Sequence, residues 1–482
     1  MSESLFFYDL ETSGKDPSKD RIMQFAGQRT DTELKPIGDP FNVIIRLNED
    51  VLPDPEAILI HGITPQQTIS DGISEAEFLE FFYQKVVTDN TVFVGFNNIS
   101  FDDEFIRYIN YRNLYDPYAW AYENGASRWD LIDVVRMTRA LRPEGINWPV
   151  DALGVNTNKL ALLAEANSIK HESAHDALSD VLATIDVARL IKQKQTKLYD
   201  YLFGIRTKQK AAELVNSGQP FIYTSPHLNL DYLHTTVVTK VAEHTKSSSY
   251  LVYDLRYDPS PWIKMDIQEL VDSWRYVSRE VSADPRLPVI NLKLNRCPAI
   301  APYGVVKDAA TLQRLRIDLD KINYNSGVLE KTDGSFSDKL LAAFEILDQE
   351  RKQKSSDKSV DSQLYDGFYS EHDRRLIGKF HQNPDLYNIQ ELKNDLEDPR
   401  LRSLCDFYVA HNNKKQLTQE ERIAWDKYLN QRLFNGGEAS LLARYFKKIE
   451  QLLLERTDPS SKVLLEDLKL YGESLMPSYI EE

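Results

Sequence analysis

The chain has 482 residues, of which 42% are hydrophobic and 27% are charged. This length exceeds what one hydrophobic core usually organises, so we expect several folded domains and exclude disordered and fibrous proteins. The formal net charge of −16 excludes a protein that coats nucleic acid without specificity, because such binding depends on neutralising phosphates. A nucleic acid would have to bind along a local basic path.

The start of the chain has neither the basic segment nor the apolar run of a secretory signal. No stretch of about eighteen apolar residues occurs, so we expect a cytoplasmic protein without membrane contact. Cys297 and Cys405 lie far apart and have no Cys or His neighbours at zinc spacing. They predict two buried thiols and neither a disulfide nor a zinc site.

Residues 1–194 alternate strand-like apolar runs with amphipathic stretches, which is typical of an α/β domain. The strands are predicted over 5–8 and 91–96, and the helices over 75–87, 101–112 and 175–194.

Residues 195–352 have a different pattern, which predicts a small mixed β domain with few helices. Its strands are expected over 221–224, 235–242, 250–255 and 289–294, and a helix over 266–277. The polar stretch 352–363 predicts a linker. Residues 364–482 predict a helical domain, in which Thr418 and Glu421 form a capping box, Gly436-Gly437 ends that helix, and a further helix covers 439–456.

The first candidate site is Asp9-Leu10-Glu11, directly after the apolar run Leu5–Tyr8. Residues two apart on a strand share a face, so both carboxylates can reach one site while Leu10 faces the core. Hard oxygen ligands of this kind suit Mg²⁺ or Mn²⁺. The pattern alone is weak, because Asp-x-Glu recurs and is usually solvated surface; copies also begin at Asp31, Asp54, Asp348 and Asp395.

The second candidate is Asp102, in the segment Gly95–Glu104, where a strand is expected to lead directly into a helix. A carboxylate in the first helical turn is stabilised by the helix dipole, so capping is the simpler explanation for Asp102 taken alone. We expect Asp103 to have that capping role.

The third candidate is His175 with Asp180, at the start of a long amphipathic helix. His171 and Asp176 form a competing pair at the same spacing. We favour His175 and Asp180, because Asp176 suits a first-turn position and His171 lies in the preceding polar loop.

Taken together, the carboxylates Asp9, Glu11, Asp102 and Asp180 could hold two divalent ions about 4 Å apart, the arrangement used for phosphodiester hydrolysis. His175 could then accept the proton of the attacking water as general base.

These motifs, in this order, resemble the DEDD exonucleases whose fifth catalytic residue is histidine. Asp9-x-Glu11, Asp102 in Asn-x-x-x-Phe-Asp, and His175-x-x-x-x-Asp180 carry the resemblance, and His61-Gly-Ile-Thr64 is similar to a run between the first two motifs. Beyond them the chain is similar to the bacterial exonuclease I family over most of its length, through 116–120, 128–131, 141–149 and 198–203, and more loosely through 295–298 and 363–368.

The resemblance implies a ribonuclease-H-like nuclease domain, a Src-homology-3-like β domain and a C-terminal helical domain that together enclose single-stranded DNA. It also implies processive 3′→5′ release of 5′-mononucleotides in DNA repair and recombination, two Mg²⁺ ions with Mn²⁺ as a substitute, a partnership with single-strand-binding protein, and a monomer. One departure is Lys159, where the family leads us to expect arginine; lysine keeps the charge and loses the bidentate fork.

The stretch 107–142 interleaves arginines with aromatic residues, as a sequence-tolerant groove for a single strand requires. We assign Trp120 and Trp129 to the core. The candidate DNA contacts are Glu11, Thr12, Arg107, Tyr118, Tyr122, Arg136, Arg142 and Lys159.

Two alternatives remain open at this stage. A proofreading or RNA-trimming exonuclease of the same superfamily would share all five catalytic residues, although such enzymes tend to be little more than the nuclease domain. A nuclease-fold scaffold that binds without cutting would be expected to lack at least one catalytic carboxylate, and none is missing here.

Overall fold

The computed structural model describes residues 3–171, 176–245, 249–275, 286–353, 359–383 and 387–476. The chain divides into two compact units. Unit 1 comprises Met1–Ala126, His171–Leu182 and Lys358–Glu482, and unit 2 comprises Ser127–Lys170 and Ala183–Asp357. Within the described residues, no helix has the length and apolar character needed to cross a bilayer.

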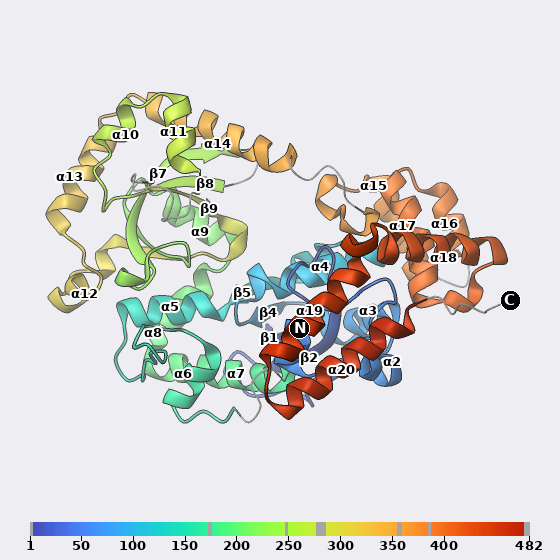
Figure 1. Ribbon diagram of the computed structural model, residues 1–482. Helices are drawn as coiled ribbons and strands as arrows, with labels where there is room; N and C mark the ends of the chain where they lie inside the picture. Colours follow the sequence, from blue (N-terminus) through green and yellow to red (C-terminus); the bar gives the residue numbers. More distant parts are fainter. Residues whose placement is uncertain are drawn as a thin grey trace. The chain divides into compact units, whose positions relative to one another are not determined.

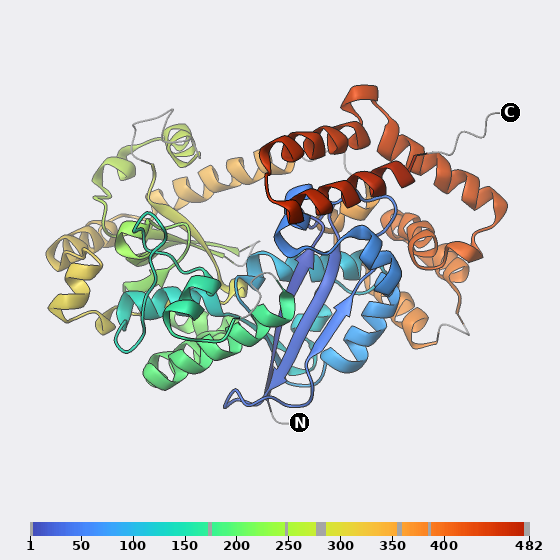
Figure 2. The same cartoon turned by 60° about the horizontal axis from the view of Figure 1, so that its bottom comes forward.

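Unit 1 is built on a sheet whose strands are hydrogen-bonded in the order β3-β2-β1-β4 (Figures 1 and 2). Strand β1 is antiparallel to β2 and parallel to β4. The strands are β1 (Ser4–Thr12), β2 (Ile22–Thr30), β3 (Phe41–Ile44) and β4 (Thr91–Gly95).

Side chains alternate along β1, and this alternation places the site. Phe6, Tyr8 and Leu10 join the aromatic core of the sheet with Phe25 and Phe93. Because successive side chains of a strand point to opposite faces, Asp9 and Glu11 lie on the other face. Burial of the first face thus fixes where the carboxylates point.

Helices of the first 126 residues flank this sheet, and the helices after residue 358 pack on the same unit (Figure 1). One shared core joins Tyr108 and Tyr111 to Leu401 and Leu404, and another joins Ile58 to Ile449. The helices are α1 (Pro55–His61), α2 (Pro65–Asp71), α3 (Glu75–Phe81), α4 (Asp102–Arg112), the first turns of α7 (Ala177–Lys194), α15 (Glu371–Gln382), α16 (Ile389–Asp395), α17 (Pro399–Asn412), α18 (Gln419–Phe434), α19 (Leu441–Glu455) and α20 (Pro459–Ser474).

Unit 2 contains an antiparallel sheet in the order β10-β6-β7-β8-β9, made of β6 (Phe221–Thr224), β7 (Thr235–His244), β8 (Ser249–Asp254), β9 (Val289–Lys293) and β10 (Ala299–Pro302). The unit begins with β5 (Ser127–Asp130) and α5 (Leu131–Leu141). Its other helices are α6 (Leu160–Ala166), the later turns of α7, α8 (Thr196–Ile205), α9 (Lys208–Val215), α10 (Ser260–Lys264), α11 (Ile267–Trp274), α12 (Ala309–Arg314), α13 (Leu319–Glu330) and α14 (Ser335–Gln353).

The structure confirms the predicted order along the chain, in which an α/β part is followed by a mixed β part and then by a helical part. The capping box at the start of α18 is present, with Thr418 accepting from the Glu421 backbone and Glu421 accepting in return. Gly436 and Gly437 follow this helix with positive φ angles, as expected for a helix stop. Cys405 is buried as predicted, whereas Cys297 is only half-buried.

Several predictions about the elements were wrong. The middle region is rich in helices, because α13 and α14 and five shorter helices accompany its strands. Strand β2 was missed because Gln24, Gly27 and Gln28 interrupt its apolar pattern while the whole strand is nearly buried. Residues 354–358 of the predicted linker 352–363 lie outside the described residues, and its end is not an exposed loop. Asp361 and Ser362 are buried, Asp361 accepts from buried Arg21, and Ser362 donates to the half-buried Ser18 carbonyl.

Candidate active site

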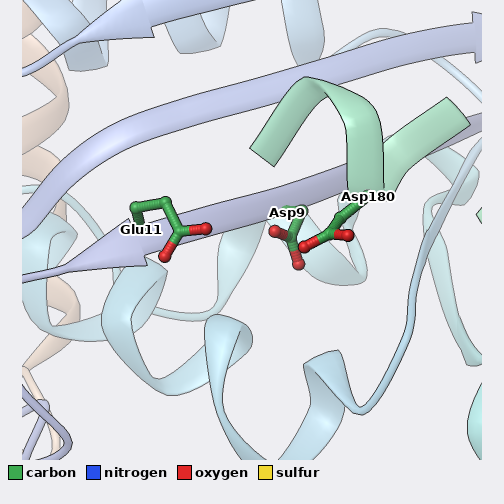
Figure 3. A group of neighbouring side chains, drawn as sticks. All are labelled: Asp9, Glu11 and Asp180. Atoms are coloured by element: carbon green, nitrogen blue, oxygen red, sulfur yellow. The ribbon is translucent and has the colours of Figure 1, made fainter. Parts of the chain in front are cut away.

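Three carboxylates meet at the far end of β1. One oxygen from each of Asp9, Glu11 and Asp180 lies within 4.8 Å of the others, and in the described part of the chain this is the group of acidic, histidine or cysteine side chains close enough to share a metal ion. Figure 3 shows the carboxylates of Asp9 and Asp180 next to one another, with Glu11 further along the same strand. We call this group the carboxylate ledge.

Two elements supply the ledge. Asp9 and Glu11 are two residues apart on β1, and Leu10 between them is buried in the core. Asp180 lies in the first turn of α7. Asp176 directly precedes α7 and accepts a hydrogen bond from the Ser179 backbone at 3.1 Å, which confirms its expected place at the helix start.

Burial and mutual repulsion raise the pKa values of the two ledge carboxylates on β1. Burial, followed by repulsion from Asp180 and Asp176, raises the pKa of Asp9 well above its usual value. Burial and repulsion from Asp9, Asp180 and Asp176 raise the pKa of Glu11 to about 9. A divalent cation would reverse this repulsion, so the three carboxylates fit a metal site.

The two candidate histidines differ in what the structure describes. His171 Nε2–H donates to Asp180 Oδ1 at 2.5 Å, so His171 contacts the ledge through a carboxylate. His175, predicted as general base, lies outside the described residues. His171 lies in the loop before α7, as expected, and from there it contacts the ledge, while the role of His175 remains a prediction.

Asp102 is placed apart from the three carboxylates of the ledge. It is buried at the first residue of α4, and it is not within the close group formed by Asp9, Glu11 and Asp180. Asp103 was expected to cap α4, but its carboxylate accepts hydrogen bonds from the buried Tyr8 hydroxyl and from Asn98. Asp103 therefore connects α4 to β1.

The backbone beyond Glu11 is held by a histidine that the sequence did not single out for this task. The Ile63 backbone N–H donates to His61 Nδ1 at 3.1 Å, so Nε2 carries the proton and donates to the Thr12 carbonyl at 3.2 Å. Gly62 supplies the positive φ of 78° that ends α1 here. The His-Gly-Ile-Thr run thus supports the end of β1.

Among the predicted DNA contacts of unit 1, Glu11 and Thr12 lie on β1, and Arg107, Tyr118 and Tyr122 lie at α4 and the turns after it. Arg107 pairs with Glu104 at 2.6 Å and lies over the ring of Tyr118 at 5.5 Å. Tyr122 is 56% exposed. The Tyr365 hydroxyl donates to Glu104, which also pairs with Arg107.

The predicted contacts of unit 2 are Arg136, Arg142 and Lys159. Arg136 pairs with Asp133 at 2.6 Å, and Arg142 donates to the Leu141 carbonyl at 2.6 Å. Lys159 is exposed. Trp120 and Trp129 are buried, which confirms their assignment to the core.

Comparison with known proteins identifies the family. A model described as "Exonuclease" matches residues 6–188, a model of the exonuclease I SH3-like domain matches 206–346, and a model of the exonuclease I C-terminal domain matches 358–475. The exodeoxyribonuclease I of Haemophilus influenzae is 37% identical over 98% of this chain and 99% of its own length. The chain belongs to the exonuclease I family.

Other relatives and solved structures agree. Exodeoxyribonuclease I of Escherichia coli is 34% identical over 99% of both chains. The E. coli exonuclease I solved with a dA16 oligonucleotide has a TM-score of 0.91 at 33% identity, covering 98% of this chain and all of that one. The exonuclease I of Methylocaldum szegediense has a TM-score of 0.90 at 38% identity, covering 98% and 100%.

The family membership confirms the expected fold, a ribonuclease-H-like exonuclease domain, an SH3-like domain and a C-terminal helical domain. The protein is an exonuclease, a hydrolase of phosphodiester bonds. An exonuclease domain of this kind implies dependence on a divalent metal ion, and the carboxylate ledge fits one.

The raised pKa of Glu11 predicts a pH-dependent stability of the metal-free protein. Glu11 ionises near 4.5 when unperturbed and near 9 in the folded chain, so between these values the folded state binds more protons than the unfolded state. Stability contributed by the protonated form is therefore complete below about pH 4.5 and lost as the pH rises through about 9. In chelator, we expect the Tm of Glu11→Gln to exceed that of the wild type by a margin that grows as the pH rises across this range.

Calorimetric Tm values at several pH values test this, with Glu420→Gln, an exposed glutamate of α18, as the control. In excess Mg²⁺ the wild type should have the higher Tm, because its ledge then binds a cation. A Tm difference that does not change with pH would contradict the arrangement.

Proposed function

We propose that this exonuclease degrades single-stranded DNA in the 3′→5′ direction to 5′-mononucleotides, in DNA repair and recombination. The observation that carries the proposal is the carboxylate ledge of Asp9, Glu11 and Asp180, in a chain that aligns end to end with exodeoxyribonuclease I relatives. The E. coli relative has been solved with dA16 and with 5cy-dT13 oligonucleotides.

The residues have distinct tasks in the proposed mechanism. When bound, two Mg²⁺ ions, or Mn²⁺ in their place, would polarise the scissile phosphate and lower the pKa of the attacking water. Asp9, Glu11 and Asp180 would hold these ions, with Asp102 as a fourth ligand. His175 takes the proton from the water as general base. Thr12, buried next to the ledge, contacts the terminal nucleotide together with Glu11.

The remaining expectations follow the family. The domain division 1–194, 195–352 and 364–482, a monomer and a cytoplasmic location belong to the proposal. So does a partnership with single-strand-binding protein, because a solved structure contains that protein together with exonuclease I.

Digestion of labelled substrates tests the activity. Wild-type protein with Mg²⁺ should release a 3′ label from single-stranded DNA first and should act much less on the duplex or on RNA of the same sequence, while chelator stops cleavage. Asp9→Asn should lower the rate at least about a hundredfold, because a metal ligand supplies several kcal/mol of transition-state stabilisation. Asp31→Asn, from another Asp-x-Glu copy, is the matched control.

A preference for RNA or for a duplex end would support the proofreading or RNA-trimming alternative. Binding of single-stranded DNA without any Mg²⁺-dependent cleavage would support the non-catalytic scaffold. Full activity of Asp9→Asn would overturn the mechanism.

The two histidines should separate by their effects. His175→Ala should lower the single-turnover rate by about 10²–10⁴-fold with little change in metal affinity, as expected for a general base. His171→Ala removes a hydrogen bond to a ledge carboxylate and should weaken Mn²⁺ binding by about 10–100-fold. The reverse result, with His171→Ala inactive at saturating metal and His175→Ala active, would make His171 the base.

The cationic DNA contacts are tested by the salt dependence of binding. Lys159→Ala should reduce the slope of log K against log salt for single-stranded DNA by about 0.7, the value for one phosphate. Lys159→Arg should bind more tightly because it restores a bidentate fork. Lys210→Ala, which removes an exposed lysine already paired with Glu213 at 3.3 Å, is the control. Equal slopes for all variants would remove Lys159 from the DNA path.

A further inference from the structure

A buried arginine lies directly beyond the carboxylate ledge. Arg21 is 1% exposed, and its backbone pairs with Ser13, two residues after Glu11. The Ser13 N–H donates to the Arg21 carbonyl at 2.8 Å, and the Arg21 N–H donates to Ser13 Oγ at 2.9 Å. The regular pairing of β1 with β2 shifts between Glu11 and Thr12. The Ser13–Arg21 pair therefore closes the ladder after this irregularity and sets the course of the backbone that leaves the ledge.

The guanidinium of Arg21 is held from the C-terminal part of the chain. Its Nη2 donates to Asp361 Oδ2 at 2.8 Å, while Glu75 and Asp50 lie at 3.9 and 4.0 Å. Asp361 itself is 0% exposed. Among these acids, Asp361 makes the close contact.

The wider cluster joins arginines and a histidine to buried carboxylates. Arg112 pairs with Glu75 at 3.2 Å. His411 lies 3.1 Å from Asp50, and Arg432 lies 3.6 Å from Asp50 and 3.9 Å from Asp361. Removal of one member of such a buried set leaves its partner uncompensated, and this penalty displaces the partner from its place.

The residue after Asp361 holds the loop that connects β1 to β2. Ser362 Oγ donates to the Ser18 carbonyl at 2.7 Å. The Tyr111 hydroxyl donates to the Val360 carbonyl at 2.9 Å, which attaches the same segment to α4. The segment Val360–Ser362 thus binds the connecting loop and Arg21 together.

We propose that Asp361 and Ser362 are positioning residues for the nuclease chemistry, and that they act through Arg21 and the β1–β2 loop on the end of β1 that carries Glu11 and Thr12. The expected change in kcat rests on the proposed function, whereas the expected change in Mn²⁺ affinity does not. The C-terminal region then contributes to metal binding as well as to any grip on DNA.

The test compares two buried carboxylates of the same region. Asp361→Asn should weaken Mn²⁺ binding by about three- to tenfold and lower kcat by a similar factor, somewhat less than the loss of a residue that directly orients a metal ligand. KM for single-stranded DNA should change less than kcat, because most of the candidate DNA contacts lie outside β1. Asp361→Glu keeps the charge and should restore part of both values.

Asp373→Asn is the matched control. Asp373 is 1% exposed and accepts from the backbones of Glu397 and Asp398 at 2.8 and 3.2 Å, so its replacement should lower Tm without changing Mn²⁺ affinity or kcat. If Asp361→Asn does not fold, Ser362→Ala serves as the test, with Ser403→Ala, which also loses one hydroxyl–carbonyl bond, as its control.

Mn²⁺ affinity and kcat equal to those of the controls would overturn the positioning role, whatever the change in Tm. Wild-type protein that binds Mn²⁺ but does not cut single-stranded DNA would overturn the proposed function instead, and the Mn²⁺ affinities would still decide the role of Asp361.

Discussion

Repulsion among the carboxylates at the end of β1 is the constraint on which the site depends. Asp9 and Glu11 can be brought together with Asp180 only because the opposite face of β1 is fixed in an aromatic core. Burial and this repulsion together raise the pKa of Glu11 to about 9, so the ledge without a cation favours a protonated carboxyl. The fold holds the ligands in place before the metal binds. Such a preformed site suits Mg²⁺, a hard ion that demands near-ideal geometry and loses its bound water reluctantly.

The sequence predicted the parts of the site that follow from local patterns. Strand alternation gave the shared face of Asp9 and Glu11, and the helix start gave the place of Asp180. It favoured His175 over His171 and did not predict the contact of His171 with Asp180, because that contact depends on tertiary structure. The prediction that Asp103 caps α4 was wrong for the same reason, since its hydrogen-bond partner Tyr8 is distant in sequence.

The linker prediction failed for an instructive reason. A polar segment is usually solvated, so Asp361 and Ser362 suggested an exposed loop. Asp361 instead pairs with a buried arginine, and Ser362 with a half-buried backbone carbonyl, both more than 300 residues earlier in the chain. Only tertiary structure can show that a polar side chain is paired inside the protein.

The strongly acidic chain must still bind a polyanion, and the structure indicates how. Arg107 and Arg136 are already paired with Glu104 and Asp133 at 2.6 Å, so a phosphate would have to compete with an internal carboxylate for each of them. Such competition lowers the net gain per phosphate and disfavours binding that relies on charge alone. If the predicted contacts hold, affinity would depend on several of them at once, including stacking on exposed rings such as Tyr122, which suits a flexible single strand better than a stiff duplex.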